Sequence, residues 1–300
     1  MHPGALGDVL LAVPALRALR RAHPRDRLTL AAQPRIGELL RAFDIVDDTI
    51  DFDSLGLDTL FVDDPEPDRA RAVAGATRVV CWFGAKDPGF VRRLKVMVPE
   101  AIVAPPVVTD RSVWRHLLDT IGDDLSEECE SMRIPVEVLE QGRQTLRAAG
   151  WDGEAPLLMI HPGGGGIAKR WPGDSFVEAI TGFGMKHPSA VVVHEGPADR
   201  EAVDLVRARV SKPPLRLDNP TLPALAGALG LVALYVGNDS GISHLAAAVG
   251  ARSVVLFAPG MLPWRPWSPA AECIVISTTA LVPEDVDHVL NAMRRRWSLH

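Results

Sequence analysis

The sequence is poor in cysteine, and the cysteines it has are widely spaced. Its 300 residues include three cysteines, Cys81, Cys129 and Cys273, and no two of them form a Cys-x-x-Cys pair. This spacing predicts free thiols in a reducing cytoplasm rather than a disulfide framework. No cysteine or histidine pair has the spacing of a zinc site, so we expect no metal centre.

Long apolar runs and excess positive charge are also missing. No run of about 18 apolar residues occurs, so we expect no membrane-spanning helix. The N-terminus lacks the charged-then-apolar pattern of a secretory signal. The net charge is −6 at pH 7, which argues against a general nucleic-acid binder. The sequence has only 5 lysines but 27 arginines, so Lys169 is one of few lysines.

What the chain does have is enough length and apolar content for two domains. Apolar residues make up 47% of 300 residues, which is typical of globular domains with real cores. Helical and extended patterns alternate in both halves, which predicts an α/β fold of two Rossmann-like domains with parallel sheets. The polar, acidic segment 123–135 predicts the linker, so we place the domains at 1–130 and 131–300. In the first we expect helices over 10–22, 35–43 and 108–122, and strands over 28–33, 57–64 and 78–83.

The second half shows the alternation most clearly. We expect strands over 156–160, 190–195, 231–237 and 253–259, and helices over 172–186, 198–210, 240–250 and 283–297. In such folds ligands bind at the carboxyl ends of the parallel strands, here in a cleft between the two domains. The loops that follow these strands are therefore the places to look for a site.

The stretch HPGGGGIAKRWP, residues 161–172, follows one of these strands and holds four consecutive glycines. Glycines allow positive φ and a close backbone approach, and successive N–H groups can bind an anion. Lys169 adds a full positive charge, and the helix expected at Pro172 adds the positive end of its dipole. The spacing matches neither a Walker A loop nor a dinucleotide fingerprint. Two interpretations stay open: a phosphate-binding loop, or an exposed turn beside a solvated Lys-Arg pair.

The stretch GNDSGISHLAAAVG, residues 237–250, follows another apolar strand, which puts Asp239 at the strand's carboxyl end. Ser240 is predicted to cap the next helix, with His244 one turn on and on the same face. Asp239 could accept hydrogen bonds from sugar hydroxyls, while the N–H groups of Gly241 and the residue after it could bind a phosphate oxygen. The alternative is a capped core helix. A serine hydrolase is disfavoured, because the nucleophile-elbow pattern G-x-S-x-G lacks both outer glycines.

The stretch GALGDVLLAVPAL, residues 4–16, places a carboxylate at the start of a helix. Gly4 and Gly7 are expected to bracket a tight turn, with Asp8 beginning the helix. As an acid in the first turn, Asp8 would stabilise the helix dipole. As a functional group, it would be a base on the N-domain edge of the cleft. Both interpretations fit its position in the chain.

Together these three stretches resemble glycosyltransferase family 9, the heptosyltransferase family of lipopolysaccharide core assembly. The stretches that carry the resemblance are GALGDVLLAVPALRALR, HPGGGGIAKRWP and GNDSGISHLAAAVGARSVVLFAP, and their order and spacing match as well. The resemblance covers nearly the whole chain and is weakest over residues 60–150. It implies a GT-B fold, two Rossmann-like domains facing across a cleft. It also implies an inverting, metal-independent transfer from a nucleotide-diphosphate sugar, often ADP-heptose.

The resemblance also implies roles for individual residues. Asp8 falls on the family's proposed general base, and Lys169 on the lysine that contacts the donor diphosphate. Asp239 falls on the donor-binding aspartate. Many members contact the nucleoside with an acidic residue after the strand that matches 190–195. Glu195 and Asp199 are both candidates for this role here, and the match of the loop GPADRE favours Asp199. The donor-binding set is thus Gly163, Gly164, Lys169, Asp199, Asp239, Ser240, Gly241 and His244.

The partners implied are a nucleotide-sugar donor, which is a substrate rather than a cofactor, and a glycan or glycolipid acceptor, with no nucleic acid. The N-terminal domain would hold the acceptor and the C-terminal domain the donor. A cytoplasmic enzyme is expected, with peripheral contact at the cytoplasmic face of the inner membrane. Family members usually have a short apolar strand before the GDV motif, whereas this sequence reads Met1-His2-Pro3 there, which bears on how Asp8 is anchored. The alternatives are another GT-B nucleotide-sugar enzyme, such as a different glycan transferase or an epimerase, and a non-catalytic nucleotide-sugar-binding relative.

Overall fold

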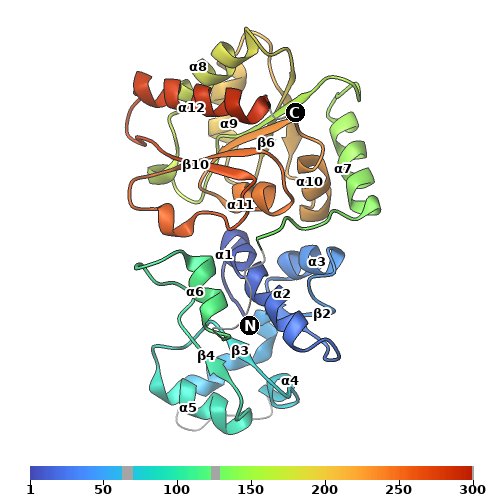
Figure 1. The fold of residues 1–300 in the computed structure, drawn as a ribbon, viewed down its shortest axis with the longest axis vertical. Helices are drawn as coiled ribbons and strands as arrows, with labels where there is room; N and C mark the ends of the chain where they lie inside the picture. Colours follow the sequence, from blue (N-terminus) through green and yellow to red (C-terminus); the bar gives the residue numbers. More distant parts are fainter. Residues whose placement is uncertain (63–69, 123–128, 299–300) are drawn as a thin grey trace. The chain divides into compact units, whose positions relative to one another are not determined.

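The computed structural model describes residues 1–62, 70–122 and 129–298. The chain divides into two compact units, residues 1–128 and 129–300, called here the N-terminal and C-terminal units. Both units alternate parallel strands and helices (Figure 1). Part of the expected linker, residues 123–128, lies outside the described residues. No helix among the described residues is long and apolar enough to span a membrane.

A six-stranded parallel sheet forms the centre of the C-terminal unit, in the order β10-β9-β8-β5-β6-β7. The first strand along the chain, β5, lies in the middle. The chain adds β6 and β7 on one side of it, then β8, β9 and β10 on the other. The sheet therefore reverses its order between β5 and β8, which is where open α/β sheets bind ligands. The strands are β5 (Leu157–His161), β6 (Ala190–Glu195), β7 (Leu215–Asp218), β8 (Leu234–Asn238), β9 (Ser253–Phe257) and β10 (Ala271–Val275).

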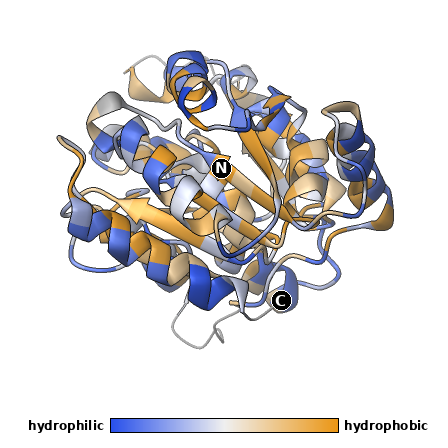
Figure 2. Cartoon of the chain, turned by 90° about the horizontal axis from the view of Figure 1, so that it is seen from above, coloured by the Kyte–Doolittle hydropathy of each residue, from blue (hydrophilic) through white to orange (hydrophobic). Residues whose placement is uncertain are grey.

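Helices cover the sheet of the C-terminal unit because its strands are almost continuously apolar and buried, as strands of parallel sheets are. α8, α9 and α12 share one apolar core with β5, β6, β8 and β9, while α10 packs against α7 and α11. In Figure 2 the strands are coloured hydrophobic and many helices show both colours. The helices are α7 (Val136–Ala148), α8 (Gly173–Gly184), α9 (Arg200–Arg209), α10 (Leu222–Leu229), α11 (Gly241–Ala248) and α12 (Pro283–Trp297), with short 3₁₀ turns η4 (Ile167–Lys169) and η5 (Leu262–Trp264).

The N-terminal unit holds two short parallel sheets, β1 with β2 and β3 with β4. Its strands are β1 (Thr29–Ala32), β2 (Asp48–Asp51), β3 (Val80–Cys81) and β4 (Ile102–Val103). Its helices are α1 (Leu6–Leu11), α2 (Val13–Ala22), α3 (Pro34–Ala42), α4 (Arg71–Ala74), α5 (Pro88–Met97) and α6 (Val113–Asp119), with 3₁₀ helices η1 (Phe52–Leu55) and η2 (Leu57–Phe61).

The backbone of Met1 and His2 lies between β1 and β3 and is hydrogen-bonded to both. The Met1 ammonium donates to the Val80 carbonyl at 2.6 Å, and the Trp82 N–H donates to the Met1 carbonyl at 3.1 Å. On the other side, the His2 N–H donates to the Ala31 carbonyl at 2.9 Å. The turn that leads to Asp8 is therefore held from both sides.

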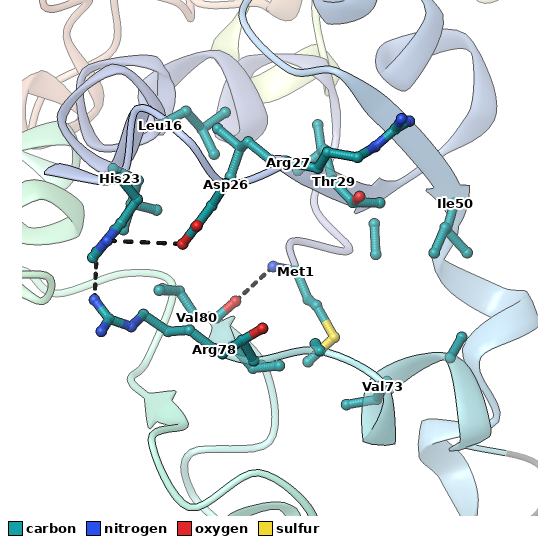
Figure 3. Close-up of a pocket in the computed structure, with 18 of the residues that line it drawn as sticks. Met1, Leu16, His23, Asp26, Arg27, Thr29, Ile50, Val73, Arg78 and Val80 are labelled. Carbon is teal, nitrogen blue, oxygen red and sulfur yellow. Dashed lines mark hydrogen bonds and ion pairs between the residues drawn. The ribbon is translucent and has the colours of Figure 1, made fainter. Parts of the chain in front are cut away.

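A cavity of about 730 Å³ lies beside Met1 (Figure 3). It is bordered by residues 28–31 along β1, residues 76–80 leading into β3, and the end of α2. Asp8 is not among the described residues that line it. The cavity is thus separate from the residues predicted to carry the chemistry.

Three sequence predictions in the N-terminal unit are wrong. The helix expected over 108–122 covers only Val113–Asp119, as α6. The helix expected over 10–22 is split at Ala12, because Pro14 has no N–H to donate to Leu10 and its ring would clash with that carbonyl. The strand expected over 57–64 is instead η2 over Leu57–Phe61; residues 63–64 lie outside the described residues. Gly56, at φ +63°, starts this 3₁₀ helix, in which Leu57 and Leu60 fall on one side and are both buried.

Candidate functional site

The glycine loop, residues 162–171, leaves the carboxyl end of β5. A Cβ on Gly163 would lie 2.1 Å from the carboxylate carbon of Asp199, so only glycine fits there. A Cβ on Gly165 or Gly166 would meet nothing within 4 Å, so that part of the loop lines open space. None of the four glycines, all of which are described, has a left-handed φ. Of the two properties that glycine allows, the close approach rather than a positive φ explains Gly163.

Asp199 follows β6 and holds the glycine loop from one side. Its carboxylate accepts hydrogen bonds from the N–H groups of Gly196 at 3.1 Å and Gly164 at 3.4 Å. It also lies 3.5 Å from the Arg170 guanidinium. The carboxylate is buried, and two of these three groups, Gly164 and Arg170, belong to the glycine loop.

Glu195, the other acid considered for a nucleoside contact, is the last residue of β6. Its Oε1 accepts a hydrogen bond from Arg216 at 2.6 Å and lies 3.5 Å from Arg200. The side chain is buried, and Arg216 comes from β7, the neighbouring strand. These contacts place Glu195 in an ion pair along the edge of the sheet.

Lys169 and Asp239 meet across the reversal between β5 and β8. The Lys169 ammonium lies 3.4 Å from Oδ2 of Asp239, with 39% of the lysine side chain exposed and 7% of the aspartate. His244 Nε2 lies 3.7 Å from the other carboxylate oxygen. Three residues that the sequence singled out therefore form one cluster, whose cation faces solvent while its anion is buried.

Helix α11 begins beside this cluster. Ser240 is its N-cap, as predicted, and accepts a hydrogen bond from the Ser243 N–H at 3.3 Å. The N–H groups of Gly241 and Ile242 belong to the first turn, where a helix has no internal acceptors for them. They add the positive end of the helix dipole to the charge of Lys169.

Two buried histidines lie at the carboxyl ends of β5 and β6, next to the glycine loop. The Nδ1 atoms of His161 and His194 are 3.1 Å apart, and His161 Nε2 lies 3.9 Å from the Asp199 carboxylate. Burial lowers the pKa of His161, although Asp199 opposes the shift. Burial, with His161 nearby, lowers the pKa of His194 well below its usual value. The rings are therefore neutral at pH 7, so one nitrogen can donate to the other.

Asp8 lies in the N-terminal unit, in the first turn of α1. The helix begins at Leu6, so Gly7 and Asp8 are inside it rather than before it. One oxygen of Asp8, Oδ2, accepts a hydrogen bond from the Ala5 N–H at 3.2 Å. A Cβ on Gly4 would lie 2.7 Å from the Cβ of Asp8, so glycine there allows the turn to close on the helix. The side chain is half-buried.

The sequence model of glycosyltransferase family 9 (heptosyltransferase) matches residues 96–287, which is more than half of the chain. The chain belongs to glycosyltransferase family 9. A curated family relative, lipooligosaccharide heptosyltransferase 2 of Campylobacter jejuni subsp. jejuni serotype O:2, is 25% identical over 145 residues. That match spans 45% of this chain and 44% of the relative, less than half of its length.

Two solved glycosyltransferase structures match the fold over nearly the full chain. A family 9 glycosyl transferase from Veillonella parvula DSM 2008 has a TM-score of 0.75 at 20% identity, covering 100% of this chain and 96% of its own. The ADP-heptose lipopolysaccharide heptosyltransferase II of E. coli has a TM-score of 0.74 at 17% identity, covering 99% and 97%. The α/β, GT-B-type fold predicted from the sequence is confirmed.

Sequence reasoning missed several residues that hold the candidate site together. Asn238, fully buried at the end of β8, bonds to the backbone of the glycine loop. The His161–His194 pair and Arg170 also contact the loop or Asp199. A signal existed for Asn238, because it is a polar residue directly at the end of an apolar strand. Among the described residues, no group of three or more His, Cys, Asp or Glu side chains could hold a metal ion.

Proposed function

We propose that this protein is an inverting, metal-independent glycosyltransferase that moves a heptose from ADP-heptose to a glycan acceptor of the lipopolysaccharide-core type. Membership of family 9 supports sugar transfer. The similar E. coli structure is named an ADP-heptose lipopolysaccharide heptosyltransferase, which supports this donor and acceptor class. The observation that carries the proposal is the cluster of Lys169, Asp239 and the first turn of α11 at the sheet's reversal point.

The donor diphosphate would bind between the glycine loop and the start of α11. The Lys169 ammonium, being partly exposed, can turn from Asp239 to a phosphate oxygen without leaving the cluster. The N–H groups of Gly241 and Ile242 would meet a second oxygen. As the bond to the sugar breaks, negative charge grows on the leaving ADP, and these donors stabilise it. A preorganised donor of this kind contributes about 3–4 kcal/mol in the transition state.

Asp239 would accept hydrogen bonds from hydroxyls of the donor sugar when Lys169 turns to the phosphates. His244, at 3.7 Å from its other oxygen, would hold the carboxylate in place. Asp199 would act on the donor through the loop, because its carboxylate contacts the N–H groups of Gly164 and Gly196. This is a revised proposal for Asp199, in place of a direct contact with the nucleoside.

Asp8 would be the general base, on the acceptor side of the reaction. Its Oδ2 is engaged with the Ala5 N–H, which orients the carboxylate and leaves Oδ1 to take a proton. The acceptor hydroxyl would give up that proton as its oxygen attacks the anomeric carbon and ADP departs from the opposite face, which inverts the configuration. Such a base contributes on the order of 10²–10⁴ in rate.

Metal independence follows from the charge of the proposed donor site. Lys169 and the α11 dipole supply the positive charge that other transferases take from a divalent cation. We therefore expect the initial rate to be unchanged by millimolar EDTA added to metal-stripped enzyme. A rate that collapses in EDTA and returns with Mg²⁺ would contradict this part of the proposal.

The test of the proposed function is ADP release from ADP-heptose with a deacylated lipopolysaccharide-core acceptor. We expect release that depends on both substrates, and a product heavier than the acceptor by one heptose. Acceptor-dependent release of UDP or GDP from other sugar nucleotides would refute the donor assignment while retaining glycosyl transfer. Binding of ADP with no transfer to any acceptor would favour a non-catalytic nucleotide-sugar-binding protein.

A further inference from the structure

One buried carboxamide joins both ends of the glycine loop. The side chain of Asn238 donates from Nδ2 to the carbonyls of Pro162 at 2.8 Å and Gly163 at 3.0 Å. Its Oδ1 accepts from the N–H of Trp171 at 2.9 Å. The two donors and the acceptor of the amide are thus all used, and they fix its orientation. Residues 162–171 form a loop closed at its neck by this one side chain.

The sheet explains why Asn238 reaches the loop. β5 and β8 are neighbours, with His161 beside Gly237 in the register. The residues that follow, Pro162 and Asn238, therefore lie side by side, Asn238 as the last residue of β8. Asn238 is 0% exposed, so it has no surface with which to contact a substrate. Any effect that it has on a bound donor must pass through the loop.

Lys169 is two residues from the neck of the loop. Its ion-pair partner, Asp239, directly follows Asn238 at the end of β8. Trp171, whose N–H the amide accepts, is 1% exposed and packs against Phe176. One end of the loop is thus anchored in the core, and the amide ties the other end to it. The spacing between Lys169 and the start of α11 depends on this closure.

We propose that Asn238 is a positioning residue that sets the conformation of the glycine loop and thereby places Lys169 for the donor diphosphate. The proposal rests on the proposed function for the identity of the ligand, but not for the closure of the loop. The contacts at this point call for a neutral group that donates to the carbonyls and accepts from the Trp171 N–H. A carboxylate there would accept from Trp171 yet face the Pro162 and Gly163 carbonyls with no proton to offer.

The test uses Asn238→Asp and its pH dependence. A buried carboxylate that faces two carbonyl oxygens has a raised pKa, because desolvation and the lost hydrogen bonds both favour its neutral form. Above that pKa the neck opens, and we expect the dissociation constant for ADP to rise about 10- to 100-fold, the factor that one buried unpaired polar group causes. Below it, the protonated acid donates to one carbonyl and still accepts from Trp171, so affinity returns.

The measurement is calorimetric titration of ADP into full-length wild type, Asn238→Asp and Asn291→Asp between pH 8 and 5.5. Asn291 is exposed on α12, so its variant matches the charge change far from the neck. We expect the ratio of the Asn238→Asp to wild-type dissociation constants to fall as pH falls, with Asn291→Asp at a ratio near one throughout. A folded Asn238→Asp that binds ADP like wild type at pH 8 would overturn the proposal.

Hydrogen exchange separates this proposal from the proposed function. In Asn238→Ala the Trp171 amide loses its acceptor and should exchange faster, together with residues 163–169, whereas in Asn238→Asp the Trp171 amide stays protected. This pattern is expected even if wild type binds no nucleotide at all, an outcome that would refute the donor assignment alone. Equal protection of Trp171 in wild type and Asn238→Ala would overturn the loop closure itself.

Discussion

The buried His161–His194 pair predicts that the C-terminal unit loses stability in mild acid. Both rings are buried under the glycine loop and their nitrogens are 3.1 Å apart. A proton added to either ring would place a charge in the core. The perturbation is therefore a change of pH from 7.5 to 5.0, applied to wild type and to His194→Gln, which removes the titration but keeps a polar side chain.

The direction of the stability change with pH follows from the lowered pKa of His194 in the folded protein. The unfolded chain binds a proton near pH 6.5 while the folded chain does not, so stability is fully present above pH 6.5 and is lost as pH falls below it. At pH 5.0, which is about 1.5 units below the unfolded pKa, the loss for His194 is at most about 2 kcal/mol. His161 adds less, because Asp199 opposes its shift.

The assay is urea unfolding at the two pH values, with His288→Gln as the matched control because His288 is exposed on α12. We expect the free energy of unfolding of wild type and His288→Gln to fall by more than that of His194→Gln, by up to about 2 kcal/mol. An equal fall in His194→Gln and wild type would refute the reasoning.

Three further variants test the proposed roles. Lys169→Ala should weaken ADP binding about 30-fold, which corresponds to about 2 kcal/mol for a charged hydrogen bond at a partly exposed site. Calorimetric titration of ADP measures this change, with Lys186→Ala, at an exposed lysine, as the control. Equal ADP affinities in the two variants would contradict the prediction. Asp8→Asn should lower kcat by about 10²–10⁴ with ADP affinity unchanged, and normal turnover would remove Asp8 from the mechanism. Gly163→Ala should lower the free energy of unfolding in urea by about 1–3 kcal/mol, because the added Cβ would overlap a buried carboxylate. Gly165 faces open space, so Gly165→Ala should change the free energy of unfolding by less than about 0.5 kcal/mol.

The sequence predicts the C-terminal unit well because its elements carry strong local signals. The strand expected over 190–195 has those bounds, and so does the helix over 283–297. Continuous apolar runs mark buried parallel strands, and Ser240 marks a helix start, without help from distant residues. The N-terminal unit has shorter and more polar elements, such as β2 over Asp48–Asp51, which the periodicity missed.

The candidate site is only partly readable from the sequence, for a physical reason. Lys169, Asp239 and Ser240 stand in recognisable stretches, and the fold brings these stretches together. The roles of Asp199 and Asn238 depend on contacts with loop residues that are 29 or more positions away in the chain. Such contacts are set by strand order and register, which residue patterns do not specify. The need for glycine at 163 likewise arises from a tertiary neighbour rather than from a local turn.

The most direct test of the central claim, that the glycine loop and α11 bind the diphosphate of an ADP-sugar, is calorimetric titration of ADP, UDP and GDP into the wild-type protein. We predict tight binding of ADP alone, with the affinity reduced about 30-fold in Lys169→Ala and unchanged in Lys186→Ala. Binding of none of the three nucleotides, or binding of ADP that does not depend on Lys169, would contradict it.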